Sequence, residues 1–224
     1  MYCLWCDQEI ISSVNWGNLM LPPRSLTLCE ECEGKLERIT GSRCEKCSRK
    51  SAEQICSDCQ WWSTQKREVL AKNHSIYVYN AFMKEIIAKW KYRGDYVLKK
   101  VFEEAFLEAF RKEFGKYKDT VLVPIPLSDA RLAERGFNQA EALARQLPIQ
   151  SKNLLTRTDS EKQSKKSRKQ RIAGKNPFIM TETLNKPAIL VDDIYTTGTT
   201  LRHAAELLRQ NGCPKVSSYT LIRG

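Results

Sequence analysis

Apolar and polar residues alternate between two patterns along the chain from His74 onward. Short β-branched apolar runs predict strands at 75–80, 120–126, 153–156, 187–194 and 216–222. Apolar residues at helical spacing predict helices at 81–92, 95–114, 138–147 and 201–210. Strands separated by helices are typical of an α/β protein with a parallel sheet and helices on both faces.

The first 62 residues show little helical periodicity and many turn-forming residues. Eight of the nine cysteines fall here or close by in C-x-x-C pairs, namely Cys3 and Cys6, Cys29 and Cys32, Cys44 and Cys47, and Cys56 and Cys59. Two thiolates at this spacing can bind one tetrahedral ion at a Zn–S distance of about 2.3 Å. Four pairs therefore predict two zinc sites with four thiolate ligands each, whose metal contributes folding free energy to so short a segment.

Two ways of grouping the cysteine pairs stay open at this point. Pairing in chain order gives a double zinc ribbon, whereas a cross-brace joins the first pair to the third. Disulfides or redox chemistry are disfavoured, because no βαβ pattern surrounds the pairs and no secretion signal precedes them.

We therefore expect a zinc-binding domain at 1–62, a linker at 63–73 and an α/β domain at 74–224. Trp61 and Trp62 are expected to pack one domain against the other, although such a pair can also stack on bases.

Charge and length limit the possible partners. The chain has 224 residues, and 37 Lys and Arg against 26 Asp and Glu give a net charge of +11, which favours polyanionic partners such as nucleic acid. No apolar run approaches the roughly 20 residues that span a bilayer. The start, Met1 to Cys6, lacks the basic and apolar segments of a signal peptide. We expect a cytoplasmic protein without a transmembrane segment.

The strand at 187–194 leads into the chain's most informative motif. It ends in two adjacent carboxylates, continues into a loop of Thr and Gly, and then enters a helix. Vicinal carboxylates at the carboxyl end of a parallel strand can accept hydrogen bonds from two ribose hydroxyls. The loop offers backbone N–H groups, hydroxyls and a helix N-terminus to a phosphate. A buried strand with a polar turn is the simpler alternative. The predicted ligand-binding residues are Asp192, Asp193, Thr196, Thr197, Gly198, Thr199 and Thr200.

Two further segments carry cations toward the same edge of the predicted sheet. Lys91 begins the motif Lys-Tyr-Arg-Gly-Asp, and Arg131 and Arg135 follow the strand that ends in Pro126. A guanidinium binds two oxygens of a pyrophosphate at once. The alternative for both arginines is a solvated turn before the helix at 138–147.

Residues 161–171 form a strongly basic run. Such a run cannot be buried, and its charge fits a grip on a polyanion or a solvated linker. Its position also resembles that of the loop that closes over pyrophosphate in type I phosphoribosyltransferases. The predicted DNA-binding residues are Lys162, Lys165, Lys166, Arg168, Lys169 and Arg171.

These motifs together resemble the ComF/GntX family of phosphoribosyltransferase-like proteins, and the strand–loop motif resembles the fingerprint of type I phosphoribosyltransferases. The resemblance implies a type I phosphoribosyltransferase-like sheet preceded by a small four-cysteine double zinc-ribbon domain. It implies 5-phosphoribosyl 1-pyrophosphate (PRPP) with Mg2+ as ligand, bound also by Arg131 and Lys91. It further implies single-stranded DNA, a helicase-like ATPase, and a position at the inner face of the membrane, in association with the DNA-uptake channel of natural transformation.

Three functions remain in competition. The first is a DNA-handling module that retains the PRPP pocket, and the second is an active phosphoribosyltransferase in which Arg135 and Lys165 stabilise the departing pyrophosphate. No segment that could cover a nucleobase is evident, which favours the first. The third is an adaptor whose zinc ribbon docks a motor protein.

Overall fold

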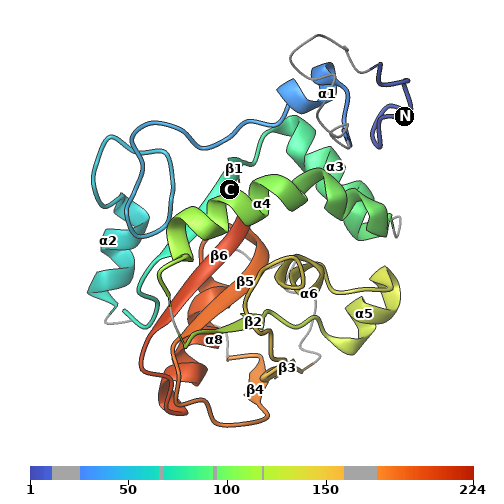
Figure 1. Cartoon of the computed structure of the whole chain (residues 1–224). Helices are drawn as coiled ribbons and strands as arrows, with labels where there is room; N and C mark the ends of the chain where they lie inside the picture. Colours follow the sequence, from blue (N-terminus) through green and yellow to red (C-terminus); the bar gives the residue numbers. More distant parts are fainter. Residues whose placement is uncertain (12–25, 66–67, 93–94, 118, 159–175) are drawn as a thin grey trace.

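The computed structural model of the chain is shown in Figure 1. It describes residues 1–11, 26–65, 68–92, 95–117, 119–158 and 176–224. No helix within these ranges is both long enough and apolar enough to span a membrane.

A four-stranded parallel sheet forms the centre of the molecule, as the alternation of strands and helices predicted. Its strands are β1 (Asn73–Val78), β2 (Val121–Pro124), β5 (Ala188–Tyr195) and β6 (Val216–Arg223), in the order β1-β6-β5-β2. Residues 150–152 extend the sheet beyond β2, because Leu122 N donates to Gln150 O and Lys152 N donates to Leu122 O, both at 2.9 Å. Strand β5 lies between β6 and β2, so it has neighbours on both sides, as a buried strand with a continuous apolar run requires.

Helices cover both faces of the sheet. On one face lie α3 (Ala81–Tyr92), α4 (Lys99–Phe114) and α6 (Gln139–Ala144), and aromatic side chains of α4 pack with Tyr219 of β6. On the other face α8 (Thr199–Gln210) packs Leu201, Ala204 and Leu208 against β2 and β5. These two layers place the carboxyl ends of β2, β5 and β6 at one edge of the molecule.

Several short elements were not expected from the sequence. A helix, α5 (Asp129–Arg135), occupies the segment interpreted as a turn carrying the two arginines, and a 3-10 turn, η1 (Tyr96–Leu98), precedes α4. A two-stranded antiparallel sheet joins β3 (Leu155–Arg157) to β4 (Phe178–Met180), of which β4 was not predicted. Elements this short carry too few apolar positions to show a period.

The cysteine-rich segment contains two short helices, α1 (Glu30–Gly34) and α2 (Ser57–Thr64), which lie apart in Figure 1. The cysteines form two groups in chain order, so the cross-brace does not occur. The first group packs with Trp5, Phe82 and Val101, and the second belongs to the core on the α8 side of the sheet. The boundary expected after residue 62 falls inside α2, whose Trp62 is buried, whereas Trp61 is 37% exposed.

Candidate functional site

Asp192 and Asp193 lie near the carboxyl end of β5, but their surroundings differ. Side chains alternate along a strand, so Asp192 shares the α8 side with Leu190 and Asp193 shares the α3 side with Val191. Asp193 forms an ion pair with Lys91 at the end of α3, and both side chains are largely buried. Asp192 instead lines a hollow with the loop that follows the strand.

The two carboxyl groups also differ in pKa. Burial and the neighbouring charge of Asp193 raise the pKa of Asp192 well above its usual value. Burial acts in the same direction on Asp193, but Lys91 and, more weakly, Arg135 overcome it and lower the pKa of Asp193. The pair therefore holds one firmly ionised carboxylate beside one that gains a proton readily.

The hollow beside Asp192 is lined by Asp192 and residues 194–201. Its volume of about 40 Å3 accommodates roughly three water-sized groups, at about 10–15 Å3 for each. That is the scale of a phosphate. Helix α8 begins at Thr199, whose N–H makes only a long hydrogen bond of 3.5 Å to Thr197 Oγ1. The helix dipole and the next N–H groups of the first turn can therefore bind an anion.

Gly198 is required by the geometry of this loop. Its φ is +75°, and a Cβ added there would lie 2.2 Å from the Tyr195 hydroxyl and 2.3 Å from Arg202 Nη1. The hydroxyls of Thr197 and Thr199 lie 2.9 Å apart and hydrogen bond across the glycine. The loop is thus a tight, preformed turn around the start of α8.

Arginines of α5 and β3 lie near the pair of aspartates. Arg131 and Arg135 both lie on α5, and Arg135 donates to Gln139 at 3.0 Å while its guanidinium lies 5.4 Å from the Tyr92 ring centre. Arg157, at the end of β3, was not predicted as a site residue. Burial and the charges of Arg131 and Arg135 lower its pKa, and Asp192 opposes them. Arg157 thus lies within electrostatic reach of Asp192, Arg131 and Arg135.

The predicted site residues divide into three groups. The hollow brings together Asp192, Thr196, Thr197, Gly198, Thr199 and Thr200. Asp193 with Lys91, and Arg131 with Arg135, lie around it without lining it. The predicted residues of the basic run lie outside the described residues, namely Lys162, Lys165, Lys166, Arg168, Lys169 and Arg171.

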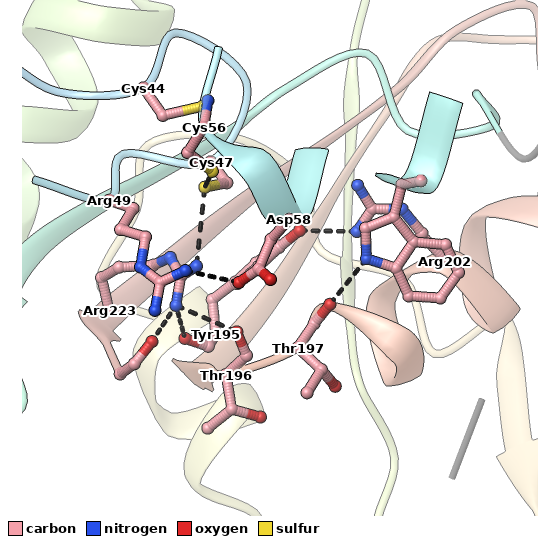
Figure 2. A network of polar contacts seen from close by, with 12 residues as sticks. Cys44, Cys47, Arg49, Cys56, Asp58, Tyr195, Thr196, Thr197, Arg202 and Arg223 are labelled. Carbon is pink, nitrogen blue, oxygen red and sulfur yellow. Dashed lines mark hydrogen bonds and ion pairs between the residues drawn. The ribbon is translucent and has the colours of Figure 1, made fainter. Parts of the chain in front are cut away.

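Arg223 and Trp62 support the carbonyls of the loop (Figure 2); the sequence predicted that Trp62 packs the two domains together, but it did not single out Arg223. Arg223, 5% exposed, donates through Nη1 to the carbonyls of Tyr195 (3.2 Å), Thr196 (2.9 Å) and Gly224, and through Nη2 to Cys47 Sγ (3.6 Å). Trp62 Nε1 donates to the carbonyl of Thr197 at 3.0 Å. No sequence signal distinguishes Arg223 from a solvent-exposed arginine.

Arg202 contacts both Tyr195 and Trp62. It donates to the hydroxyl of Tyr195 at 2.5 Å, and its guanidinium lies 4.4 Å from the ring centre of Trp62. Burial raises the pKa of Tyr195 to about 12, so the phenol remains neutral and can accept this hydrogen bond. The side chain of Arg202 thereby fills the space behind Gly198.

The two cysteine groups fit a tetrahedral metal ion. Within each group the four sulfur atoms lie within 4.8 Å of one another. Four sulfurs at about 2.3 Å from a zinc ion are about 3.8 Å apart. The distance is 3.7 Å for both Cys6–Cys29 and Cys47–Cys56. That separation is far too long for a disulfide, and the all-thiolate donor set is typical of structural zinc.

Cys47 is the cysteine of the second group that accepts a hydrogen bond from Arg223. A hydrogen bond from Cys59 and the charge of Arg223 lower its pKa to about 4, against the opposing effect of burial. This sulfur is therefore anionic, as a metal ligand must be.

Comparison with known proteins agrees with this geometry. Residues 98–224 match the model of the phosphoribosyl transferase domain. Competence protein ComFC of Bacillus subtilis (strain 168) is 42% identical over the whole chain and 95% of that protein, and ComFC of Streptococcus pneumoniae is 34% identical over the full length of both. The DNA utilization protein YhgH of Escherichia coli O6:H1 is 30% identical over 50% of this chain and 53% of that protein. The chain therefore belongs to the ComF/GntX family of phosphoribosyltransferase-like proteins, together with the ComFC competence proteins.

Proposed function

We propose that this protein binds PRPP with Mg2+ and zinc, and assists the uptake of single-stranded DNA across the cytoplasmic membrane together with a helicase-like ATPase. Membership of the family supports the coarser part, a role in competence and DNA uptake with a phosphoribosyltransferase-like domain. The proposed binding of PRPP, zinc, single-stranded DNA and the ATPase rests on the geometry of the structure.

The observation that carries PRPP binding is the hollow shared by Asp192 and the loop at 196–200. The loop and the start of α8 suit the 5-phosphate, and Asp192 suits the ribose hydroxyls and the hydrated Mg2+. Arg131, Arg135 and Arg157 suit the pyrophosphate, because each guanidinium can bind two of its oxygens. These three groups together match the three parts of PRPP.

Zinc is the metal that the cysteine groups support best. Each group supplies four thiolates at tetrahedral separation, and both groups hold a short helix against the α/β domain. In this proposal zinc is structural.

Exposed aromatic rings next to the arginines support a path for single-stranded DNA. Tyr92 is 61% exposed and lies beside Arg135, and Tyr96 is 40% exposed and lies against Phe137 at 5.0 Å between ring centres. Bases stack on such rings while cations bind the phosphates. The basic run at 161–171, which lies outside the described residues, supplies further cations for phosphates.

The surface of the first cysteine group supports a protein partner. Met1, Tyr2 and Ile11 are 61%, 66% and 85% exposed there. Exposed apolar side chains around a rigid metal site suit docking of the ATPase at the inner face of the membrane. Cys29→Ser should then abolish recovery of the ATPase in a pull-down while PRPP binding survives, and loss of both would argue against this assignment.

An active phosphoribosyltransferase is the second candidate. The observation that favours it is the arginine cluster, which would stabilise a departing pyrophosphate. Release of pyrophosphate that depends on an added nucleobase would establish this activity.

The PRPP site is tested by Asp192→Asn, which changes the hollow but leaves the Lys91–Asp193 ion pair intact. We expect loss of PRPP binding by calorimetry with unchanged zinc content, because the ribose and Mg2+ lose a carboxylate. Asp119→Asn, an exposed aspartate paired with Lys186, is the matched control. Unchanged PRPP affinity in Asp192→Asn would refute the site.

The DNA path is tested with two variants that act differently. Tyr92→Ala with Tyr96→Ala should weaken single-stranded DNA binding by about 1–3 kcal/mol per stacked base without changing its salt dependence. Alanine at Lys165, Lys166, Arg168 and Lys169 should instead lower the salt slope by about 0.7 for each lost phosphate contact. Tyr2→Ala is the control, and equal affinity of the tyrosine variant and the control would exclude stacking at this surface.

A further inference from the structure

The second cysteine group lies next to the loop at 196–200, and Figure 2 shows Arg223 between Cys47 and the residues Tyr195 and Thr196. Two donors connect them. Arg223 links Cys47 Sγ to the carbonyls of Tyr195 and Thr196, and Trp62 donates to the carbonyl of Thr197. Trp62 lies on α2, which begins after the ligand Cys56 and contains the ligand Cys59. Three successive carbonyls of the loop are therefore held by groups that the cysteine site positions.

Holding these carbonyls also orients the opposite side of the loop. In a trans peptide the C=O and the following N–H point in opposite directions, and no cis peptide occurs in the described residues. With the carbonyls of 195, 196 and 197 turned toward Arg223 and Trp62, the N–H groups of Thr196, Thr197 and Gly198 face away from them. An anion in the hollow depends on that orientation.

The position of Arg223 depends on the geometry of the cysteine site. Four thiolates and one divalent ion carry a net charge of about −2, which a buried guanidinium at 3.6 Å from one sulfur stabilises. A bound metal ion fixes the four sulfur atoms and, with them, Cys47 and the helix that carries Trp62. Without the ion these positions are no longer fixed, and the two donors lose their fixed places at the loop carbonyls.

We propose that Arg223 is a positioning residue that couples metal binding by Cys44, Cys47, Cys56 and Cys59 to anion binding on the loop at 196–200. Each ligand then stabilises the site of the other, and the coupling is reciprocal. The first cysteine group packs against α3 and α4 on the other side of the sheet, so its metal is not coupled to the loop. The identity of the anion as PRPP rests on the proposed function, but the coupling does not.

The coupling is tested in the metal-loaded full chain with Arg223→Met. Arg209→Met is the matched control, because Arg209 also donates to a backbone carbonyl, that of Cys213 at 3.2 Å, but lies at the far end of α8. Release of zinc to a chromogenic chelator should show two phases. Arg223→Met should accelerate one of them by about 10–100-fold, as loss of an outer hydrogen bond to a metal ligand does. Arg209→Met should change neither phase.

Hydrogen exchange of the backbone provides a readout that needs no ligand. Amides at 196–201 should exchange faster in Arg223→Met than in the control. Trp62→Phe, which keeps an aromatic ring but removes the donor to Thr197, should do the same if Arg223→Met fails to fold. Equal loop exchange and equal zinc release in variant and control would overturn the proposal.

Addition of PRPP with Mg2+ then separates the two proposals. In the unmodified protein it should slow the same zinc phase that Arg223→Met accelerates, and it should leave that phase unchanged in Arg223→Met. If PRPP does not bind at all, the proposed function fails, while zinc release and loop exchange still decide the coupling. If PRPP binds but slows neither phase, the coupling is wrong and the proposed function stands.

Discussion

At the scale of single residues, the site depends on two carboxylates with opposite protonation behaviour. Lys91 keeps Asp193 ionised, and that charge together with burial holds the pKa of Asp192 high. The sequence predicted that both aspartates and Lys91 belong to the site. It could not predict that Lys91 binds Asp193, because the contact joins residues about a hundred positions apart. Arg157 could have been found, since it directly follows the strand predicted at 153–156, although that strand lies in the separate two-stranded sheet.

The raised pKa of Asp192 predicts that PRPP binding depends on pH. Ribose hydroxyls and Mg2+ require the ionised carboxylate, so binding releases a proton and affinity rises with pH until the pKa of Asp192 is passed. Calorimetric titration across the pH range measures this midpoint. In Asp193→Asn the midpoint should move to lower pH, because the neighbouring negative charge that raises it is gone. An identical midpoint in this variant would contradict the assignment.

Arg157 is predicted to bind the pyrophosphate of PRPP. Arg157→Met removes a charged donor near Asp192, and hydrogen bonds to charged groups are worth about 1.5–3 kcal/mol, or roughly a 10–100-fold loss of affinity. Thermal stability should not fall by a comparable amount, because repulsion from Arg131 and Arg135 is relieved at the same time. Arg145→Met, on the exposed side of α6, is the control. Equal PRPP affinity in both variants would remove Arg157 from the site.

At the scale of elements, the strand β5, its loop and helix α8 form the unit that the sequence predicted best. A long apolar strand and an amphipathic helix give strong periodic signals, and the loop between them needs a glycine at positive φ. Helix α5 was missed because it is short and has no buried residue, so no apolar face marks it. Its two arginines are half-buried, and Arg135 already donates a hydrogen bond to Gln139.

Gly198 and Gly136 give a matched test of this loop, since both have φ of +75°. A Cβ at Gly136 would meet no atom within 4 Å. Gly136→Ala should therefore lower the free energy of unfolding only by the backbone strain, about 1–2 kcal/mol. Alanine at Gly198 also collides with Tyr195 and Arg202, which must move and release their support of the loop. Denaturant unfolding should show a clearly larger loss for Gly198→Ala, with loss of PRPP binding. Equal losses in the two variants would mean that the loop tolerates the Cβ.

At the scale of the whole molecule, the second cysteine group is part of the main core, whereas the first belongs to a small cluster of its own. The C-x-x-C spacing predicted both groups, but not this asymmetry. Spacing defines which sulfurs can share an ion, and only the fold defines what surrounds them. Arg202 and Arg223 lie beside this second group and were invisible to sequence patterns for the same reason, whereas Trp62 was expected to pack between the domains.

The asymmetry predicts different effects of losing each metal. Cys29 and Cys56 are a matched pair, because each is the N-cap of a short helix in its group. Cys56→Ser should lower the midpoint of the main thermal transition more than Cys29→Ser, since it disturbs the core around α8. Circular dichroism at increasing temperature, with zinc content measured in parallel, checks this. A larger effect of Cys29→Ser would contradict the placement of the second group in the core.

The central claim is that the strand–loop–helix unit binds PRPP, and calorimetric titration of the zinc-loaded protein with PRPP and Mg2+ tests it most directly. We predict saturable binding with one PRPP per chain, and no release of pyrophosphate when the same mixture is assayed without a nucleobase. Absence of binding at millimolar PRPP would contradict the account, because the hollow, the aspartate pair and the arginine cluster would then have no common ligand.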